Sequence, residues 1–405
     1  MFTKSFCQCR HLSTKSPPSK ASQKLSSVYG AGLSASGALA IPSLVVNTKI
    51  IPPRFVKSPR RISALNFSEI THVASGFGFS LFSSRNKLYG SGLNNYSQIT
   101  AIETSSGGQD YYISKKHIPL PRGGIIVGIA AGRAHSLVAF KDWVCAFGHN
   151  VHGQCGLDPE QQEVVVQSSD PQAASTSLLN ETPILDVHCS LDSSFILTTK
   201  GEVYAFGLNE DGQCANEEFG IQVNPSKIKG DTTGEEIVAV TGSTDTILAI
   251  SKKGDLFAWG QNEHHQAGLG NTSLQVTTSC HVPIAKRIVS AGATACSCVA
   301  LDTDGIVYTW GTQFLGQGPR ITKVSQPTPL DQPLFNNKKV VKVFAGNTCA
   351  GALNEDGEFF IWGLNRFGQL GIDSEKDQLF PLQIYFPNDV CSASLGTDHS
   401  LFLMK

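Results

Sequence analysis

Amide side chains recur at regular intervals along most of this 405-residue chain, and they are the first residues to consider for chemistry. An amide stands at Asn94, Asn150, Asn209, Asn262, Gln313 and Asn365, and a glutamine follows each at Gln98, Gln154, Gln213, Gln266, Gln317 and Gln369. A ring of amides could hold a ligand, or each could close a turn by bonding loop backbone. Their presence in every unit favours the turn role, because a binding site needs only a few units.

Histidine and cysteine offer little further chemistry. His135 and His399 share one repeat position, which we align with Phe79, Ser193, Asp245, Ala295 and Cys349 elsewhere, so we expect hydrogen bonding rather than catalysis. The eleven cysteines show no Cys-x-x-Cys pair, and we interpret Cys296 and Cys298 as small buried hydrophobic residues. His264 and His265 lack a matched cysteine or acidic partner. Neither a nucleophile elbow nor a phosphate loop occurs, so we expect no catalytic residue, metal ion or cofactor.

The segments that carry these amides have sequence patterns that predict β-strands. The reference glycine of each unit stands at Gly92, Gly148, Gly207, Gly260, Gly311 and Gly363, with spacings of 56, 59, 53, 51 and 52 residues. Turn residues such as Asp356-Gly357 separate apolar runs, and no unit shows an apolar stripe of helical period. Units of this length built from several strands predict propeller blades. We expect Trp259, Trp310 and Trp362 to pack between adjacent blades.

The sequence pattern of the units resembles that of the regulator-of-chromosome-condensation (RCC) repeat family. The resemblance rests on the run from Ile361 to Gly371 and on Ala131 to Leu137, and the phased copies extend it from about Val73 to the C-terminus. It implies an all-β, seven-bladed β-propeller that binds proteins. It also implies possible nucleotide-exchange activity on a GTPase, since the founding member exchanges nucleotide on a small nuclear GTPase and binds chromatin.

The seventh blade must come from both ends of the chain. Gly396 to Leu401 matches the first half of a unit, and Tyr29, Gly32 and Gly37 match the second half, with Ala38 in place of the glutamine. We therefore expect residues 25–48 to supply the closing strand, residues 49–70 to form a connector, and residues 71–405 to form the propeller. A membrane span over residues 25–48 is a weaker alternative, because the segment is rich in glycine and serine.

The N-terminal segment differs in charge from the remainder. Residues 1–68 contain ten Lys and Arg and no acid, whereas residues 69–405 contain 22 Lys and Arg against 33 Asp and Glu. Residues 1–24 have the composition of a mitochondrial transit peptide, and a basic tail for nuclear import or nucleic acid is the alternative. We predict a location in the mitochondrial matrix or on the matrix side of the inner membrane.

Two insertions lie outside the repeat, at residues 100–117 and 158–182. The second contains Gln161, Gln162, Val164, Val165 and Val166, which we predict as a partner-binding loop, or as a wedge hairpin if the protein exchanges nucleotide.

The expected function is a non-catalytic scaffold in assembly of the large mitochondrial ribosomal subunit and in translation. The expected partners are proteins, and the candidates are a GTPase, mitochondrial ribosomal RNA and assembly factors. We expect no DNA, because the repeat region is acidic. The alternative is a guanine-nucleotide exchange factor for a mitochondrial dynamin-like fusion GTPase. A nuclear small-GTPase exchanger ranks below both.

Overall fold

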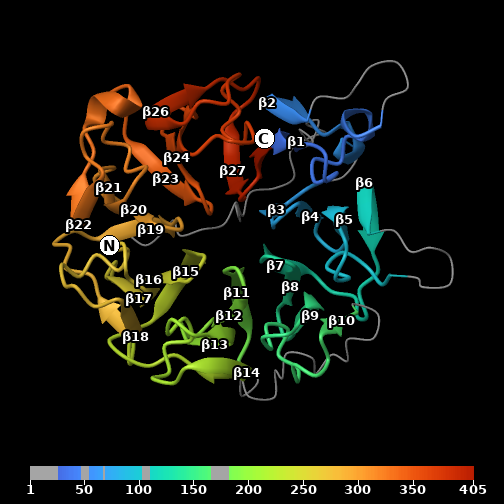
Figure 1. Ribbon diagram of the computed structural model, residues 1–405, viewed down its shortest axis with the longest axis horizontal. Coiled ribbons are helices and arrows are strands. Elements are labelled where there is room, and N and C mark those ends of the chain that lie inside the picture. Colours follow the sequence, from blue (N-terminus) through green and yellow to red (C-terminus); the bar gives the residue numbers. More distant parts are fainter. Residues whose placement is uncertain (1–25, 47–53, 67–68, 103–109, 166–181) are drawn as a thin grey trace, which may run out of the picture.

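The computed structural model describes residues 26–46, 54–66, 69–102, 110–165 and 182–405. These residues form seven four-stranded antiparallel sheets, arranged as the blades of a propeller around a central channel (Figure 1). The innermost strands contact one another in a closed circuit, in the order β3, β7, β11, β15, β19, β23 and β27. The predicted all-β seven-bladed propeller is therefore confirmed.

Six blades are continuous in sequence, and we number them 1 to 6. Blade 1 contains β3 (His72–Ser75), β4 (Phe79–Ser83), β5 (Leu88–Leu93) and β6 (Tyr111–Ile118). Blade 2 contains β7 (Ile126–Ala131), β8 (His135–Phe140), β9 (Val144–His149) and β10 (Glu163–Val164). Blade 3 contains β11 (Ile184–Cys189), β12 (Ser193–Thr198), β13 (Val203–Asn209) and β14 (Gly220–Lys227).

The other three continuous blades follow the same plan. Blade 4 contains β15 (Ile237–Ser243), β16 (Thr246–Ser251), β17 (Leu256–Gln261) and β18 (Gln275–His281). Blade 5 contains β19 (Ile288–Ala293), β20 (Ser297–Asp302), β21 (Val307–Thr312) and β22 (Lys323–Pro329). Blade 6 contains β23 (Val340–Ala345), β24 (Cys349–Asn354), β25 (Phe359–Gly363) and β26 (Gln378–Ile384). The short 3-10 helices are η1 (Pro42–Leu44), η2 (Ser63–Leu65) and η5 (Gln332–Phe335).

The remaining blade joins the two ends of the chain, and we call it the composite blade. From the channel outwards it contains β27 (Val390–Leu395), β28 (His399–Met404), β1 (Ser27–Leu33) and β2 (Phe55–Arg61), so that blue strands lie beside red ones in Figure 1. Tyr29 pairs with Phe402, and Gly32 pairs with His399. The predicted meeting of the termini is confirmed. Because the composite blade closes the ring, every blade has a neighbouring blade on each side.

Two expectations about the N-terminal region require correction. The connector expected at residues 49–70 includes β2, so each end of the chain contributes two strands rather than the N-terminal end contributing one. The basic sequence of β2 and its Pro59 concealed a strand. An outermost strand tolerates this proline, because one of its edges faces no neighbouring strand. The alternative of a membrane span over residues 25–48 is also wrong, since Ser27–Leu33 is a sheet strand. Among the described residues, no helix is long and apolar enough to cross a membrane.

The reference glycines create a bulge in the third strand of the blades. At Gly207 the backbone has φ 108°, and a Cβ atom there would lie 2.4 Å from the carbonyl oxygen of Asp192 on the loop before the second strand. The strand register shifts between Ala205 and Gly207. Glycine is needed because an L side chain rarely adopts this conformation and would meet backbone.

Each blade has two kinds of strand ends, which define the two faces of the propeller. The turns between second and third strands, such as Ser84–Lys87 and Ser251–Asp255, lie on one face, which we call the hairpin face. The loops that follow the third strands carry the repeated amides, and they lie on the opposite face, which we call the Asn–Gln face.

Candidate functional site

The repeated asparagines are buried and hold the loops of the Asn–Gln face. In Asn262, Oδ1 accepts a hydrogen bond from the backbone N of Ala267 at 3.0 Å, and Nδ2 donates to the carbonyl oxygen of Ser273 at 2.7 Å. The same five-residue link joins Asn150 to Cys155 and Asn365 to Leu370. The predicted turn role is confirmed. These amides are therefore already satisfied and are not displayed to a ligand.

The repeated glutamines act both within their own loop and towards the next blade. Gln213 Oε1 accepts from the backbone N of Asp211 at 2.9 Å, and its Nε2 donates to Oδ1 of Asp245 on blade 4 at 2.8 Å. Asp245 is mostly buried, and this burial raises the pKa of its carboxyl group. The side chains of Gln154, Gln213 and Gln266 thus link neighbouring blades. The side chains of Gln98, Gln317 and Gln369 donate within their own blades.

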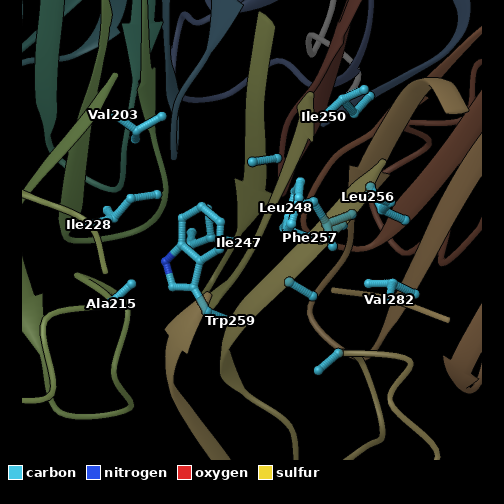
Figure 2. Packing of buried hydrophobic residues seen from close by; sticks show 14 of the residues in the cluster. Val203, Ala215, Ile228, Ile247, Leu248, Ile250, Leu256, Phe257, Trp259 and Val282 are labelled. Atoms are coloured by element: carbon cyan, nitrogen blue, oxygen red, sulfur yellow. The ribbon is translucent and has the colours of Figure 1, made fainter. Parts of the chain in front are cut away.

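The main-chain carbonyl at this glutamine position also joins adjacent blades. At three blade interfaces the donor is a serine hydroxyl: Ser91 donates to Ala38, Ser136 to Gln98 and Ser194 to Gln154. At two interfaces the donor is an indole N–H: Trp259 donates to Gln213 and Trp310 to Gln266. We call these the serine seams and the tryptophan seams. Figure 2 shows Trp259 packed among Val203, Ala215 and Ile228 of blade 3, which confirms the predicted packing role of this tryptophan.

The two candidate histidines are buried between blades. His135 Nε2 lies 3.0 Å from Ser194 Oγ on blade 3, and His399 Nε2 lies 2.8 Å from Ser80 Oγ on blade 1. Burial lowers the pKa of His135 to about 3. The expected structural role of these histidines is confirmed, because neither ring is exposed to a substrate.

The alignment of the histidine position with blades 4 and 5 was wrong. Thr246 and Ser297 pair with the reference glycines Gly260 and Gly311, as His135 pairs with Gly148. Asp245 and Ala295 instead lie in the inner turns, one residue before β16 and two residues before β20. The inner turn of blade 4 has two residues, whereas that of blade 5 has three, as does the turn before His135.

Six of the nine described cysteines are buried like apolar residues, whereas Cys280, Cys296 and Cys391 are half-buried, so the predicted burial holds for Cys298 and was wrong for Cys296. Cys214 and Cys349 are buried, and burial raises the pKa of each thiol to about 12. Cys298 lies on β20 with its Sγ 3.2 Å from the carbonyl oxygen of Gln266, while Cys296 lies in the preceding turn. Within the described ranges, no cluster of three or more metal-ligating side chains occurs.

A cavity of about 210 Å³ occupies the Asn–Gln end of the central channel. It is lined by the inner strands and the turns that follow them, including Ser190, Thr244 and Asn347. Each of these three side chains has a buried oxygen atom without a hydrogen-bond partner among the described residues. The cavity is polar and large enough to hold water, and the ring of His188 on its wall is hydrogen-bonded to the carbonyl oxygen of Gly242 at 3.1 Å.

The candidate partner loop is divided between surface and core. Gln161 and Gln162 are exposed and Val165 is half-buried, whereas Val164 is buried in β10, where it pairs with Gly148. Val166 lies outside the described residues. Val164 therefore packs within the propeller, and the exposed amides are the part of the loop that could meet a partner.

An aromatic cluster that we did not predict from the sequence lies beside this loop. The rings of Tyr96 and His149 are 4.5 Å apart, and His152 lies edge-on to His149 at 6.4 Å. Glu163 pairs with His149 in the sheet and accepts a hydrogen bond from Ser97 of blade 1. Tyr96 is 39% exposed, so the cluster adds aromatic surface between blades 1 and 2. Its residues belong to different repeats, and no local spacing indicates their proximity.

The fold and these seams define a closed propeller of the RCC type, whose repeated polar residues serve its own structure. Residues 184–213 and 356–403 each match the regulator of chromosome condensation (RCC1) repeat. A mouse protein described as RCC1-like G exchanging factor-like protein is 33% identical over 406 residues, which cover 93% of this chain and 87% of that protein.

Two further comparisons support the same assignment. The crystal structure of human WBSCR16 matches with a TM-score of 0.85 and 30% identity, covering 94% of this chain and 99% of that chain. The Arabidopsis thaliana protein described as RCC1 domain-containing protein RUG3, mitochondrial, is 26% identical over 297 residues, covering 68% of this chain and 64% of that protein. The chain belongs to the RCC1 repeat family and is similar to its RCC1-like G exchanging factor-like proteins.

Proposed function

We propose that this protein is a mitochondrial interaction scaffold that supports assembly of the large ribosomal subunit and thereby translation. The observation that carries the proposal is the internal use of the repeated amides, histidines and tryptophans, which leaves the loops and charged surfaces of a rigid ring for binding partners. Its partners would be proteins, ribosomal RNA or assembly factors rather than a small substrate. Fold resemblance alone does not assign chemistry.

The mitochondrial location rests on two observations. Residues 1–24 are basic and acid-free, with the composition of an import peptide. The RUG3 protein, which matches over much of the propeller, is described as mitochondrial. We therefore place the protein in the matrix or on the matrix side of the inner membrane. A fluorescent fusion at the C-terminus, with and without residues 2–24, tests this placement.

Deletion of the gene tests the scaffold role. We expect mature large-subunit ribosomal RNA to fall relative to small-subunit ribosomal RNA, followed by a fall in mitochondrial protein synthesis. The full-length chain should restore both, and a chain lacking residues 2–24 should restore neither. An unchanged ratio of the two RNAs with normal synthesis would exclude the proposal.

A guanine-nucleotide exchange factor is the second candidate, because the mouse relative is described as an exchanging-factor-like protein. The partner would be a mitochondrial dynamin-like fusion GTPase, and an exposed loop including Gln161 and Gln162 would form the displacing element. Release of a fluorescent guanine nucleotide, measured with and without the protein, tests this function.

The loop itself can be tested separately from exchange in general. The double variant Gln161→Ala with Gln162→Ala should slow release if this loop acts, whereas Val164 is unsuitable because it is buried. No acceleration by the unaltered protein would exclude exchange on the GTPase tested. Acceleration that persists in the double variant would exclude the loop.

A further inference from the structure

The positive charge of the propeller is concentrated in one part of the ring. Residues 54–141 carry 11 Lys and Arg against three Asp and Glu, whereas residues 142–405 carry 15 Lys and Arg against 30 Asp and Glu. The first range covers β2 of the composite blade, all of blade 1 and the inner half of blade 2. The near-neutral chain therefore combines a basic sector with an acidic remainder, which its net charge of −1 conceals.

Within this sector, most of the cations gather on and near the hairpin face. Arg60 and Arg61 end β2, opposite the start of β1, and Lys116 and His117 lie near the end of β6. The turns and connections of the same face add more cations. We call the whole set the basic arc, and its members are Arg60, Arg61, Arg85, Lys87, Lys115, Lys116, His117, Arg122 and Lys141.

Contacts between elements make this arc continuous. β6 contacts η2, which directly follows Arg61. The backbone N of Ile126 donates to the carbonyl oxygen of Arg85 at 2.9 Å, so the β4–β5 turn lies against the connection that carries Arg122. In Figure 1, β2 and β6 lie on neighbouring blades at the rim.

The same face provides an internal comparison for these cations. In blades 3 to 6, Lys227, Lys252, Lys253, Lys286 and Lys338 each form an ion pair with a carboxylate, at distances of 2.7, 2.8, 2.7, 3.1 and 2.7 Å. In the described part of the arc, no ion pair involves Arg60, Arg61, Arg85, Lys87, Lys116, Arg122 or Lys141, all of which are exposed. Of the acidic residues near the arc in sequence, Glu69, Asp110 and Asp142 form none either, and Glu103 lies outside the described residues. These seven cations thus form an uncompensated field that attracts anions.

Aromatic rings are placed between the cations. Lys115 Nζ lies 5.0 Å from the ring centre of Tyr89, and His117 stacks edge-on to the same ring at 5.7 Å. Arg122 lies 5.8 Å from the ring centre of Trp143, which is buried against Phe140, so the half-buried ring of Tyr89 is the one offered for a base to stack on. Cationic grooves with interspersed aromatic rings suit single-stranded nucleic acid, because the cations contact phosphates while bases stack. A membrane surface would instead favour several exposed apolar side chains, and Ile125 is the large aliphatic residue exposed along this part of the hairpin face.

We propose that the basic arc of the composite blade, blade 1 and blade 2 binds single-stranded RNA. The choice of RNA among polyanions rests on the proposed role in ribosome assembly, while the site itself rests on the uncompensated cations. The phosphate backbone lies along the arc on the hairpin face. The Asn–Gln face, with the loop at Gln161 and Gln162, remains available for a protein partner.

The test compares two triple variants of the full-length chain with the same change in net charge. Arg85→Gln, Lys87→Gln and Lys116→Gln remove three arc cations, and Lys252→Gln, Lys253→Gln and Lys286→Gln remove three paired lysines from the same face. Binding is measured by fluorescence anisotropy of a labelled oligouridine of about 20 nucleotides, long enough to cover one stacking platform, across a series of salt concentrations. All three proteins carry the same basic N-terminal segment, so its contribution cancels.

We expect the arc variant to bind at least about tenfold more weakly, and the slope of log K against log salt to fall by about 2, since each lost phosphate contact contributes about 0.7. The control variant should retain the affinity and slope of the unaltered protein. Equal affinity of the arc variant and the unaltered protein would overturn the proposal. An equal loss in both variants would also overturn it, since net charge would then be the cause.

Two alternative ligands, duplex RNA and lipid vesicles, test which class of polyanion the arc binds. Duplex RNA of the same length should bind more weakly, because its bases cannot stack on the ring of Tyr89. Binding to vesicles of phosphatidylcholine containing anionic lipid should not depend on the arc. Vesicle binding that depends on the arc, without binding of oligouridine, would replace RNA by a membrane surface. The deletion experiment on ribosomal RNA is independent of these measurements, so failure of either proposal can be recognised by itself.

Discussion

The serine seams and the tryptophan seams solve one packing problem with different side chains. In both, a main-chain carbonyl buried at the edge of one blade needs a hydrogen-bond donor from the next blade. Ser136 supplies a hydroxyl at 2.7 Å, and Trp259 supplies an indole N–H at 2.7 Å. An unsatisfied buried carbonyl costs about 1–3 kcal/mol, so each seam must provide a donor.

Strand pairing explains why the donor can change. Ser136 lies opposite Phe147 and Ser194 lies opposite Phe206, whereas Ile247 lies opposite Trp259. Each pair faces the preceding blade, and either member can carry the donor while the other fills space. The backbone acceptor thus lies at the same repeat position in each of these seams. The donor can lie at either of two positions, the one on the second strand or the one opposite it on the third strand.

Removing Trp259 should have the largest effect. Trp259→Ala removes a fully buried aromatic ring together with the donor to Gln213, and we expect a loss of about 3–5 kcal/mol in the free energy of unfolding. Trp259→Phe keeps most of the ring and should lose about 1–3 kcal/mol, mainly through the unsatisfied carbonyl. Urea titration followed by circular dichroism measures both. Equal losses for the two variants would show that the hydrogen bond, and not the ring, dominates this seam.

Acid should weaken the serine seam that contains His135. This ring is neutral in the folded protein, where its pKa is about 3, while in the unfolded chain it binds a proton below its ordinary pKa of 6.5. The unfolded state therefore binds more protons between these values, and stability should fall by about 1.4 kcal/mol per pH unit as the pH decreases through this window.

A variant isolates this contribution from other titrating groups. Phe79 pairs with Gly92 as His135 pairs with Gly148, so His135→Phe places a residue that the repeat already accepts. The variant should lose less stability than the unaltered protein between pH 6.5 and pH 4.5, by about 2–3 kcal/mol. Parallel pH curves for the two proteins would contradict the assignment.

Removal of one seam hydroxyl should have a moderate effect. Ser136→Ala leaves the Gln98 carbonyl without its donor and should cost about 1–3 kcal/mol. Ser114→Ala, on the exposed face of β6, is the matched control and should change the free energy of unfolding by less than about 0.5 kcal/mol. A similar small change at Ser136 would mean that the seam carbonyl finds another donor.

Conversion of one seam type into the other gives the smallest and sharpest signal. Trp259→Phe combined with Ile247→Ser recreates in blade 4 the pair that Phe206 and Ser194 form in blade 3. We expect the double variant to be more stable than the sum of the single variants predicts, by about 1–2 kcal/mol. Strict additivity would show that a serine at this position does not reach the Gln213 carbonyl.

Much of the architecture could be predicted from the sequence, because each repeat carries its own turn chemistry. The side-chain oxygens of Asn262 and Gln266 accept hydrogen bonds from backbone N–H groups within five residues, so their spacing reports this part of their role directly. The composite blade was also predictable, since Tyr29 and Gly32 repeat the pattern of a third strand. The outermost strand β2 was not, because edge strands have weak sequence requirements.

The candidate site was harder to predict from the sequence than the fold. The loop at Gln161 and Gln162 was identified by its length, but the burial of Val164 follows from its pairing with Gly148. The basic arc was missed because total charge was considered over the whole repeat region. A count restricted to residues 54–141 would have indicated it.

The amino-acid sequence by itself determined the repeat, its period and the turn residues, because these depend on contacts between residues close together in the chain. The tertiary structure decided which carbonyl each serine or indole reaches, and which lysines are neutralised. Those outcomes depend on segments separated by tens to hundreds of residues, whose distances are set only when the ring closes. The strands that carry Arg60 and Lys116 are neighbours in the ring for the same reason, since β2 and β6 lie on adjacent blades of a closed circle.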